Sequence, residues 1–332
     1  MEIIRAGEDD RGVILIALLW ILTALSVIAL SFSRETFVEV SAARNTRDLE
    51  DAYYIARAGM ATTIYQLYQK LYLSPMSQAG ALSQQPDAID LGKVAGKFGD
   101  GEYEVDVQDE SGKINVNMAG EEQLGALVTA IGIQEPDASI IVDSILDWRD
   151  VDKIPRQNGA EDDYYQGLQP PYLAKNAVLG TVEELLLVRG VTPDYYYGHR
   201  EKTPDGRIVE RYGLSRYLTA YSSSNRINVN YAPIPVLLSI PGMTQEAAQR
   251  IYEHRLVKPF QNAEDLSNAT SGLDPSLTTM LMWQRGTVYT LTASAHRENS
   301  KAVRIIRAVI NLDMREINKY RCIYWNENVA NW

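Results

Sequence analysis

The sequence predicts an α+β fold in which a long amino-terminal helix packs on an antiparallel sheet, with a large, mostly α-helical domain inserted in that sheet. Three observations support this prediction. One helical pattern runs from an apolar segment near the amino terminus to about residue 73. Alternating strand patterns occur near residue 105 and again near residue 300, and mainly helical patterns fill the residues between them.

The composition describes a folded, acidic protein. Of the 332 residues, 45% are hydrophobic, which is enough for a sizeable core, and the formal net charge is −11. Such a charge argues against a general affinity for nucleic acid or for an anionic membrane surface, because both attractions depend on clustered Lys and Arg. The single cysteine, Cys322, excludes an intramolecular disulfide.

The apolar segment of residues 13–32 contains no charged residue. As a helix it would reach about 30 Å, the thickness of the hydrocarbon core of a bilayer. It could be a secretory signal removed within "ALSFSRETF", a permanent anchor, or an anchor that follows a short leader cut beside Gly12. The helical pattern continues beyond it without a proline until Pro75, which favours retention. We therefore expect a transmembrane helix over residues 13–33 and an exposed amphipathic continuation over 34–73.

The amino-terminal residues resemble those of type IV pilin-like proteins, or pseudopilins. A polar leader, residues 1–12, ends in Arg11-Gly12, and the apolar segment begins directly after the glycine. The resemblance implies a pilin-like fold, cleavage after Gly12 by a prepilin peptidase, and methylation of the new amino terminus at Val13. It also implies that the helix stays in the bacterial inner membrane while the body of the protein lies in the periplasm.

The fifth residue after the expected cleavage point is Ala17, whereas most of the family has Glu there. A Glu buried among apolar helices is stable only beside a buried cation, such as the free amino terminus of a neighbouring subunit. A subunit without it is expected at the tip of the fibre. This departure resembles the minor pseudopilin K family of type II secretion systems, and it implies partners among pseudopilins I and J and the other pseudopilins. Alternatively, Ala17 is an ordinary small membrane residue.

The strand patterns define the sheet domain. Residues 74–98 are rich in Ser, Gln, Ala and Gly and predict a connection, so 74–109 is assigned to this linker and the first strands. Tyr103, Val105 and Val107 alternate with polar residues, as in a strand with one buried face. Two further strands are predicted on either side of a turn at 297–300. Residues 231–315 are assigned to this remainder of the sheet domain, with a helix hairpin, and 316–332 to a carboxyl-terminal tail.

The sequence Ile-Asn-Val-Asn occurs twice, at 114–117 and 227–230, and a helical pattern follows it each time. A short extended piece followed by a helix pair is therefore predicted to be used twice. The two copies are expected to mark where the chain leaves and re-enters the sheet domain, which gives an inserted helical domain of residues 110–230.

The stretch "SIPGMTQEAAQRIYEHR" followed by "PFQNAEDL" resembles a helix-hairpin-helix unit and suggests a rival function, a membrane-anchored DNA-binding protein of the competence type. Such units hold a phosphate on backbone amides of a tight hairpin, where a second glycine allows close approach. Here Met243 and Thr244 follow Gly242, so the second glycine is missing. A hairpin kept for packing is the alternative, and we expect no nucleic-acid partner.

The stretch "DWRDVDKIPRQNGAEDDYY" concentrates carboxylates around a Pro and a Gly. Carboxylates two residues apart, with another about ten residues on, can converge on one calcium ion. Ile154 and Pro155 exclude an EF-hand loop, and a solvated loop paired with nearby Lys and Arg remains the alternative. The stretch also resembles the calcium-binding loop of pseudopilin K, which favours a structural calcium ion. The candidate ligands are Asp147, Asp150, Asp152, Glu161 and Asp162.

Enzymatic motifs are missing from the sequence. It contains no phosphate-binding loop, no nucleophile elbow and no pair of Cys or His at zinc-ligand spacing, and its three His are scattered. The sequence therefore predicts a non-enzymatic function, and the resemblance implies a minor pseudopilin that caps the tip of the type II secretion fibre.

Overall fold

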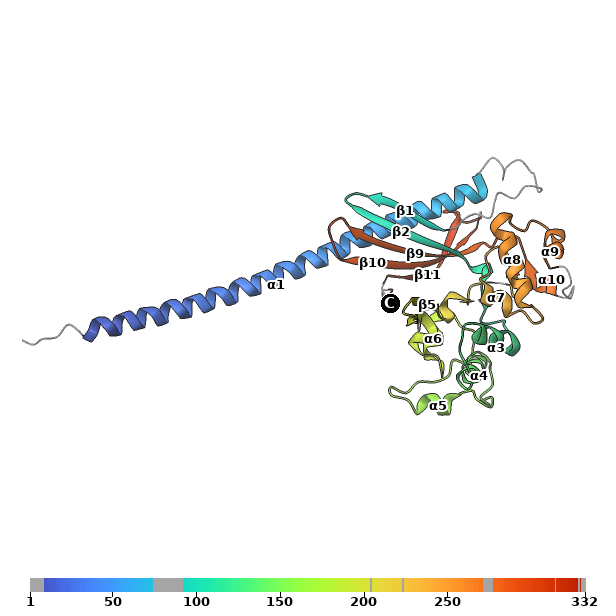
Figure 1. The fold of residues 1–332 in the computed structure, drawn as a ribbon, viewed down its shortest axis with the longest axis horizontal. Coiled ribbons are helices and arrows are strands. Elements are labelled where there is room, and N and C mark those ends of the chain that lie inside the picture. The colour runs from blue at the N-terminus through green and yellow to red at the C-terminus, as the bar shows by residue number, and fades with distance from the viewer. Residues whose placement is uncertain are drawn as a thin grey trace, which may run out of the picture.

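The computed structural model describes residues 9–73, 92–203, 205–222, 224–270, 277–313, 315–327 and 329. The first element is α1 (Asp9–Tyr68), a single helix of 60 residues that continues into the π-helical turn η1 (Gln69–Leu73). Figure 1 shows its amino-terminal half extending away from the rest of the chain and its carboxyl-terminal half lying along the sheet. The prediction of one continuous helix is confirmed from residue 9 onward; the first eight leader residues lie outside the described part.

The sheet has five antiparallel strands in the order β1-β2-β9-β10-β11. They are β1 (Lys93–Phe98), β2 (Gly101–Asp109), β9 (Val288–Arg297), β10 (Val303–Leu312) and β11 (Tyr320–Asn326). One face of α1, including Ala56 and Met60, is buried against inward-facing residues such as Leu291. The predicted strand around residues 103–107 and the predicted hairpin around 297–300 are confirmed.

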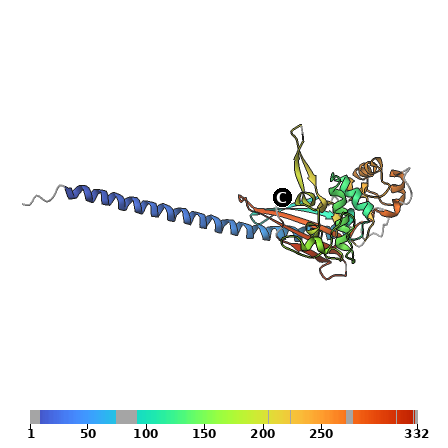
Figure 2. The ribbon, with the colours of Figure 1, turned by 90° about the horizontal axis from the view of Figure 1, so that it is seen from below.

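The helical domain leaves the sheet after β2 and rejoins it at β9. Its first part, after the 3-10 turn η2 (Glu110–Gly112), comprises β3 (Ile114–Asn115), α3 (Glu121–Ala130), α4 (Asp137–Arg149), α5 (Asp162–Gln166), η3 (Val182–Leu187), α6 (Pro193–Tyr197), β4 (Gly198–Lys202), β5 (Ile208–Tyr212), η4 (Leu214–Arg216) and β6 (Leu218–Thr219). Its second part comprises β7 (Ile227–Asn228), α7 (Ile234–Leu238), α8 (Gln245–Val257), α9 (Ala263–Ala269), α10 (Leu277–Met280) and β8 (Leu281–Met282). Figure 2 shows the β4–β5 hairpin projecting from this domain.

The two Ile-Asn-Val-Asn segments adopt the same local structure. The side chain of Asn117 bonds both backbone groups of Leu179, and the side chain of Asn230 makes the same pair of bonds with Phe260. Each segment also pairs with a parallel strand, β3 with β6 and β7 with β8. The prediction that one extended piece with its helices is used twice is confirmed.

In each of the two units, an arginine side chain donates hydrogen bonds to two backbone carbonyls. Arg149, at the end of α4, donates hydrogen bonds to the backbone carbonyls of Val116 and Ala119, and Arg255 makes the two equivalent bonds in the second unit. Buried backbone carbonyls need hydrogen-bond donors, and these arginines supply them. The repeat therefore extends beyond its four-residue signature to the side chain that ends its second helix.

The boundary of the helical domain differs from the predicted residue 230. Buried residues of the second unit, such as Ile227 and Leu281, belong to the same core as Ile114 and Leu218 of the first. The chain returns to the sheet only at β9, which begins at Val288. The second Ile-Asn-Val-Asn segment therefore begins a second helical unit and does not mark the return to the sheet. The sequence could not show this difference, because the same four residues begin both units.

Two edge strands also differ from the predicted assignment. β11 lies within the predicted tail of residues 316–332, and β1 lies within the predicted connection of residues 74–98. Neither strand contains a fully buried residue, so neither carries the contrast of apolar and polar positions by which a half-buried strand is predicted from sequence. In addition, the pairing of β11 with β10 shifts register between Val309 and Ile310. Residues 74–91 of the predicted connection lie outside the described residues.

A buried carboxylate joins the two crossings between the sheet and the helical domain. Asp109, at the end of β2, accepts hydrogen bonds from the backbone and hydroxyl of Ser111 at 2.8 and 2.5 Å and from the backbone N–H of Gly286 at 3.2 Å. Gly286 precedes β9, so one side chain holds the outgoing and returning segments together. A Cβ at position 286 would overlap this carboxylate, which explains the glycine.

We expect Asp109 to make the stability of the junction depend on pH. Burial raises the pKa of its carboxyl from 3.8 to about 6. Because the folded pKa lies above the unfolded one, this contribution is fully present below about pH 4 and is lost as the pH rises through about 6. The loss amounts to about 3 kcal/mol. Denaturant unfolding of the detergent-solubilised chain between pH 4 and 7 measures it.

Asp109→Asn should reduce this pH dependence, to which the raised pKa of Glu161 also contributes, whatever its effect on absolute stability. Asp106→Asn, at a less buried position on the same strand, serves as the matched control and should keep the wild-type slope. Equal slopes in all three proteins would contradict the assignment.

Candidate functional site

The candidate site lies in the loop between α4 and α5. Asp150 directly follows the last residue of α4, and Glu161 directly precedes α5. Aromatic packing fixes the base of the loop, since the rings of Trp148 on α4 and Tyr165 on α5 meet edge to face at 5.2 Å. Both rings are almost fully buried. The two ends of the loop are therefore held at a defined separation by the core.

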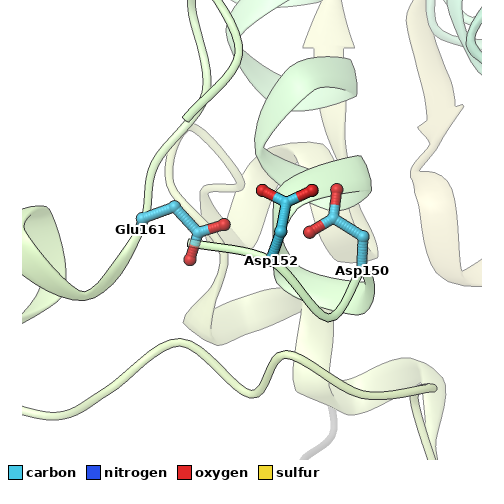
Figure 3. A group of neighbouring side chains, drawn as sticks. All are labelled: Asp150, Asp152 and Glu161. Atoms are coloured by element: carbon cyan, nitrogen blue, oxygen red, sulfur yellow. The ribbon is translucent and has the colours of Figure 1, made fainter. Parts of the chain in front are cut away.

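Three carboxylates converge in this loop. Asp150, Asp152 and Glu161 each offer an oxygen, and these oxygens lie within 4.8 Å of one another. Figure 3 shows the three side chains pointing toward a common space. Asp152 lies on the exposed side and Glu161 on the buried side. The site therefore has the ligand chemistry and spacing of a hard cation site that opens to solvent on one side.

Glu161 forms no ion pair in the described residues. Its side chain is only 5% exposed, and neither carboxylate oxygen accepts a well-formed hydrogen bond. Burial, followed by the charges of Asp147, Asp150 and Asp162, raises its pKa to about 7, and the nearby amide of Asn176 opposes this rise. One oxygen of Asp150 is likewise buried without a partner. Unpaired buried carboxylate oxygens are costly, and a bound cation would remove that cost.

The other two predicted ligands lie outside this cluster and are held by Arg156 and Lys153, and Arg156 also pairs with Asp150 at 2.6 Å. Asp147 is fully buried, and its oxygens accept hydrogen bonds from the backbone and side chain of Arg156. Asp162 accepts from Lys153 at 2.7 Å and from the backbone of Ala174. These two residues fix the shape of the loop, while the structure brings together the other three predicted ligands.

Asn176 is a residue that sequence reasoning missed. Its side-chain oxygen is buried without a hydrogen-bond partner, and its backbone has a φ of 47°. The Asp162–Ala174 hydrogen bond links the beginning of α5 to the segment that precedes Asn176. A single Asn fourteen positions after Asp162 carries no spacing signal, so only the folded loop reveals its proximity to Glu161.

The donor set fits calcium and a structural role. Calcium takes six to eight oxygen ligands, and three carboxylates, an amide oxygen, backbone carbonyls and water can provide them. The described residues of the loop place no Cys, Ser or His beside the carboxylates that could serve as an activated nucleophile. The arrangement can cross-link an irregular segment of a domain that has no disulfide.

The expected membrane and processing residues lie on α1. Gly12, Val13 and Ala17 belong to this helix, and the apolar residues from Val13 to Phe32 are all exposed. Within the described residues, one helix is long and apolar enough to span a bilayer, and its apolar part is covered by nothing in this chain. The prediction of an apolar helix that continues into the folded body is confirmed.

The predicted helix hairpin is formed by α7 and α8. Gly242, in the turn between them, has a φ of 84°, which favours glycine, and Thr244 caps α8 by accepting a hydrogen bond from the backbone of Ala247. Thr244 stands where the second glycine of such a hairpin would be, and Met243 lies between it and Gly242. The side chain of Met243 packs against the helical core.

Two stretches of the chain match known families. Residues 101–199 match the family described as type II secretion system (T2SS), protein K, and residues 222–280 match the helix-hairpin-helix motif. The first match contains the acidic loop, and the second contains α7, α8 and α9. Each therefore covers most of one of the two repeated units.

Curated relatives and a solved structure extend these matches. Type II secretion system protein K of Pseudomonas aeruginosa is 24% identical over 279 residues, which are 79% of this chain and 77% of that protein. Its counterpart from Aeromonas hydrophila is 27% identical over 56% of this chain and 60% of that protein. The GspK-GspI-GspJ complex from the enterotoxigenic Escherichia coli type 2 secretion system contains a chain that aligns with a TM-score of 0.62 and 14% identity, over 87% of this chain and 100% of that one. This last likeness shows that the fold is shared.

Proposed function

Since this chain belongs to the type II secretion system protein K family, we propose that it is the minor pseudopilin at the tip of a type II secretion fibre. In this role it nucleates and caps a fibre that drives folded proteins out of the periplasm. The observation that carries the proposal is α1, a single helix with an apolar, uncovered first half and a second half packed on the sheet. The proposed role is mechanical and involves no reaction.

The first half of α1 anchors the subunit in the inner membrane. A helix with this hydropathy and no buried residues is unstable in water, because its apolar side chains remain fully hydrated. The body after it carries the sheet and the helical domain, which we place in the periplasm. Cleavage after Gly12 by a prepilin peptidase leaves Val13 as a methylated amino terminus.

Ala17 accounts for the tip position. A methyl side chain cannot neutralise the amino terminus of a neighbouring subunit in a low-dielectric bundle, so no subunit can dock above this one without leaving a buried charge. The bulky helical domain at the far end of α1 blocks the same direction (Figure 1). Both features favour a subunit that ends the fibre.

Mass spectrometry of the membrane-extracted protein tests the anchor. We expect the mature chain to begin at methylated Val13, and we expect Gly12→Leu to abolish processing because the peptidase requires a small residue before the cut. Gly120→Ala, at an exposed position in the body with an ordinary φ of −78° and no atom within 4 Å of the added Cβ, is the processing control. A soluble product that begins beyond residue 30 would overturn the proposal.

We propose pseudopilins I and J as the direct partners, because the related GspK forms a complex with GspI and GspJ. The exposed part of α1 between the membrane segment and the sheet provides the surface. Phe37 and Val38 are 73% and 59% exposed there, and Val40 is 44% exposed. Such a run of apolar side chains is unfavourable in water and is expected to be covered by neighbouring helices.

Phe37→Ala should weaken co-purification with pseudopilins I and J by about tenfold or more, because a phenylalanine buried at a helix interface contributes about 1.5–3 kcal/mol. Glu39→Ala, two positions away on the same helix, is the matched control and should leave the complex intact. Equal recovery of the complex for both variants would show that the partners bind another surface.

We propose that Asp150, Asp152 and Glu161 hold a structural calcium ion, with Asn176 as a further oxygen ligand. The support is the set of buried oxygens without partners, which a divalent cation would satisfy together. Asp147 and Asp162 then act by fixing the loop through Arg156 and Lys153.

Calcium at about one hundred times its dissociation constant should stabilise the folded chain by about 2.7 kcal/mol, visible as a rise of a few degrees in the melting temperature relative to a chelator. Glu161→Gln should remove this difference, whereas Asp163→Asn, its exposed neighbour, should keep it. Asn176→Ala should reduce it. A melting temperature that calcium leaves unchanged in the wild type would refute the site.

The helix-hairpin-helix match does not favour DNA binding as a second function. Thr244 stands where the second glycine of the motif would be, two residues after Gly242, and the chain carries a net charge of −11. The hairpin instead closes the core of the second unit.

A further inference from the structure

We propose that the β4–β5 hairpin accepts an acidic, extended segment of a partner protein as a third strand. The hairpin projects from the helical domain (Figure 2), and most of it lies between the two family matches, one of which ends at residue 199 while the other begins at residue 222. Every residue of its two strands except Gly198 is exposed. The proposal does not depend on the role of the chain at the fibre tip.

Glycines fix the base of the hairpin. A Cβ at Gly198 would overlap the backbone of Arg211, and a Cβ at Gly213 would overlap the backbone carbonyls of Tyr195 and Tyr196. The two strands are therefore in close backbone contact where they join α6. Tyr196 is almost fully buried in the helical core, so the core holds the base of the hairpin in place.

The outer part of the hairpin lacks the support that such a structure normally needs. A two-stranded hairpin alone is marginally stable in water, and a third strand or a packed face stabilises it. Ile208 is 73% exposed and Tyr212 is 48% exposed, so apolar side chains remain in contact with water. A strand added by a partner would cover them and would offset the conformational entropy lost when the hairpin is ordered.

One edge of the hairpin offers backbone groups to a further strand. The backbone N–H of Thr203 donates to the carbonyl of Arg207, so the backbone groups of Thr203 face β5. Successive residues of a strand point these groups in opposite directions. Those of Arg200 and Lys202 therefore point away from β5. Within the described residues this sheet has two strands, so the edge of β4 is open.

The two faces of the hairpin differ in their charge balance. On one face Arg211 pairs with Glu201 at 3.0 Å, which compensates both charges. Residues that are directly paired across the strands share a face. The opposite face therefore carries Arg200, Lys202, Ile208, Glu210 and Tyr212.

This opposite face is basic and selects an acidic occupant. In the described residues, neither Arg200 nor Lys202 forms an ion pair, although Glu210 is the cross-strand partner of Arg200. The guanidinium of Arg216 lies 5.2 Å from the ring centre of Tyr212 and forms no ion pair there either. Three cations thus stand beside one carboxylate, in a chain whose net charge is −11. A strand with Glu or Asp on this face would complement them.

Fluorescence anisotropy on the full-length, detergent-solubilised chain tests this proposal. The probe is a labelled peptide of about nine residues in which Glu alternates with Val and Thr, so that its carboxylates share one face of a strand. A peptide with Lys in place of Glu and a thymidine oligonucleotide are its counterparts. Lys202→Glu reverses one charge at the open edge. Lys301→Glu makes the same exchange at an exposed position between β9 and β10, as the matched control.

We expect the Glu peptide to bind and the Lys peptide not to, with an affinity that falls as the ionic strength rises to about 0.15 M. Lys202→Glu should weaken binding about fivefold, whereas Lys301→Glu should change it less than twofold. Equal effects of the two exchanges, or no binding at low ionic strength, would overturn the proposal. Tighter binding of the oligonucleotide than of the Glu peptide would assign the hairpin to nucleic acid and overturn it as well.

Amide hydrogen exchange separates strand addition from attraction between charges. With the Glu peptide bound, the backbone amides of Arg200 and Lys202 should exchange at least about fivefold more slowly, because the added strand accepts their hydrogen bonds. Those of Ile208 and Glu210, on the opposite edge of the hairpin, are the internal control and should keep their rates. Unchanged exchange at Arg200 and Lys202 with the peptide bound would contradict strand addition at β4.

Discussion

The structure depends on one constraint: a single uninterrupted helix must be stable first in lipid and then against a sheet. α1 meets it by changing composition without changing geometry. Its first half is apolar on every side, and its second half narrows the apolar surface to one face. That face is built from small residues at the closest contacts. Ala52 and Ala56 are fully buried, and a Cβ at Gly59 would overlap the ring of Tyr103.

The same helix determines what the rest of the chain can do. The sheet is firmly seated on α1, so a large domain can be inserted between β2 and β9 without weakening the helix–sheet core. The two crossings are close together because β2 and β9 pair along their full length. The side chain of Asp109 can therefore accept hydrogen bonds from both segments, from Ser111 and from Gly286. A load on the helical domain would therefore be transmitted to the sheet, and from the sheet to the anchored helix.

Within the helical domain, one unit is elaborated and the other is compact. Both units share the asparagine and arginine bonds to backbone groups. Between α4 and η3 the first unit adds the acidic loop and α5, whereas only a few residues separate α8 from α9 in the second. The added loop has little apolar surface of its own. Its order depends on aromatic packing at its base and on the ion pairs of Arg156 and Lys153. It also depends on the group that binds the two buried carboxylate oxygens of Glu161, which we propose to be a calcium ion.

The sequence by itself determined the elements whose signal is local. The continuity of α1, the alternation in β2, the repeated Ile-Asn-Val-Asn segment and the concentration of carboxylates after α4 can all be read from neighbouring residues, because helix and strand periodicity are properties of contiguous chain. Only the tertiary structure decided that the second repeat stays in the helical core and that β11 completes the sheet. It also decided that three of the five predicted carboxylates converge, while Asp147 and Asp162 lie outside that cluster. It also revealed the proximity of Asn176 to Glu161. These features depend on which distant segments pack together, and that choice is made by burial over the whole core.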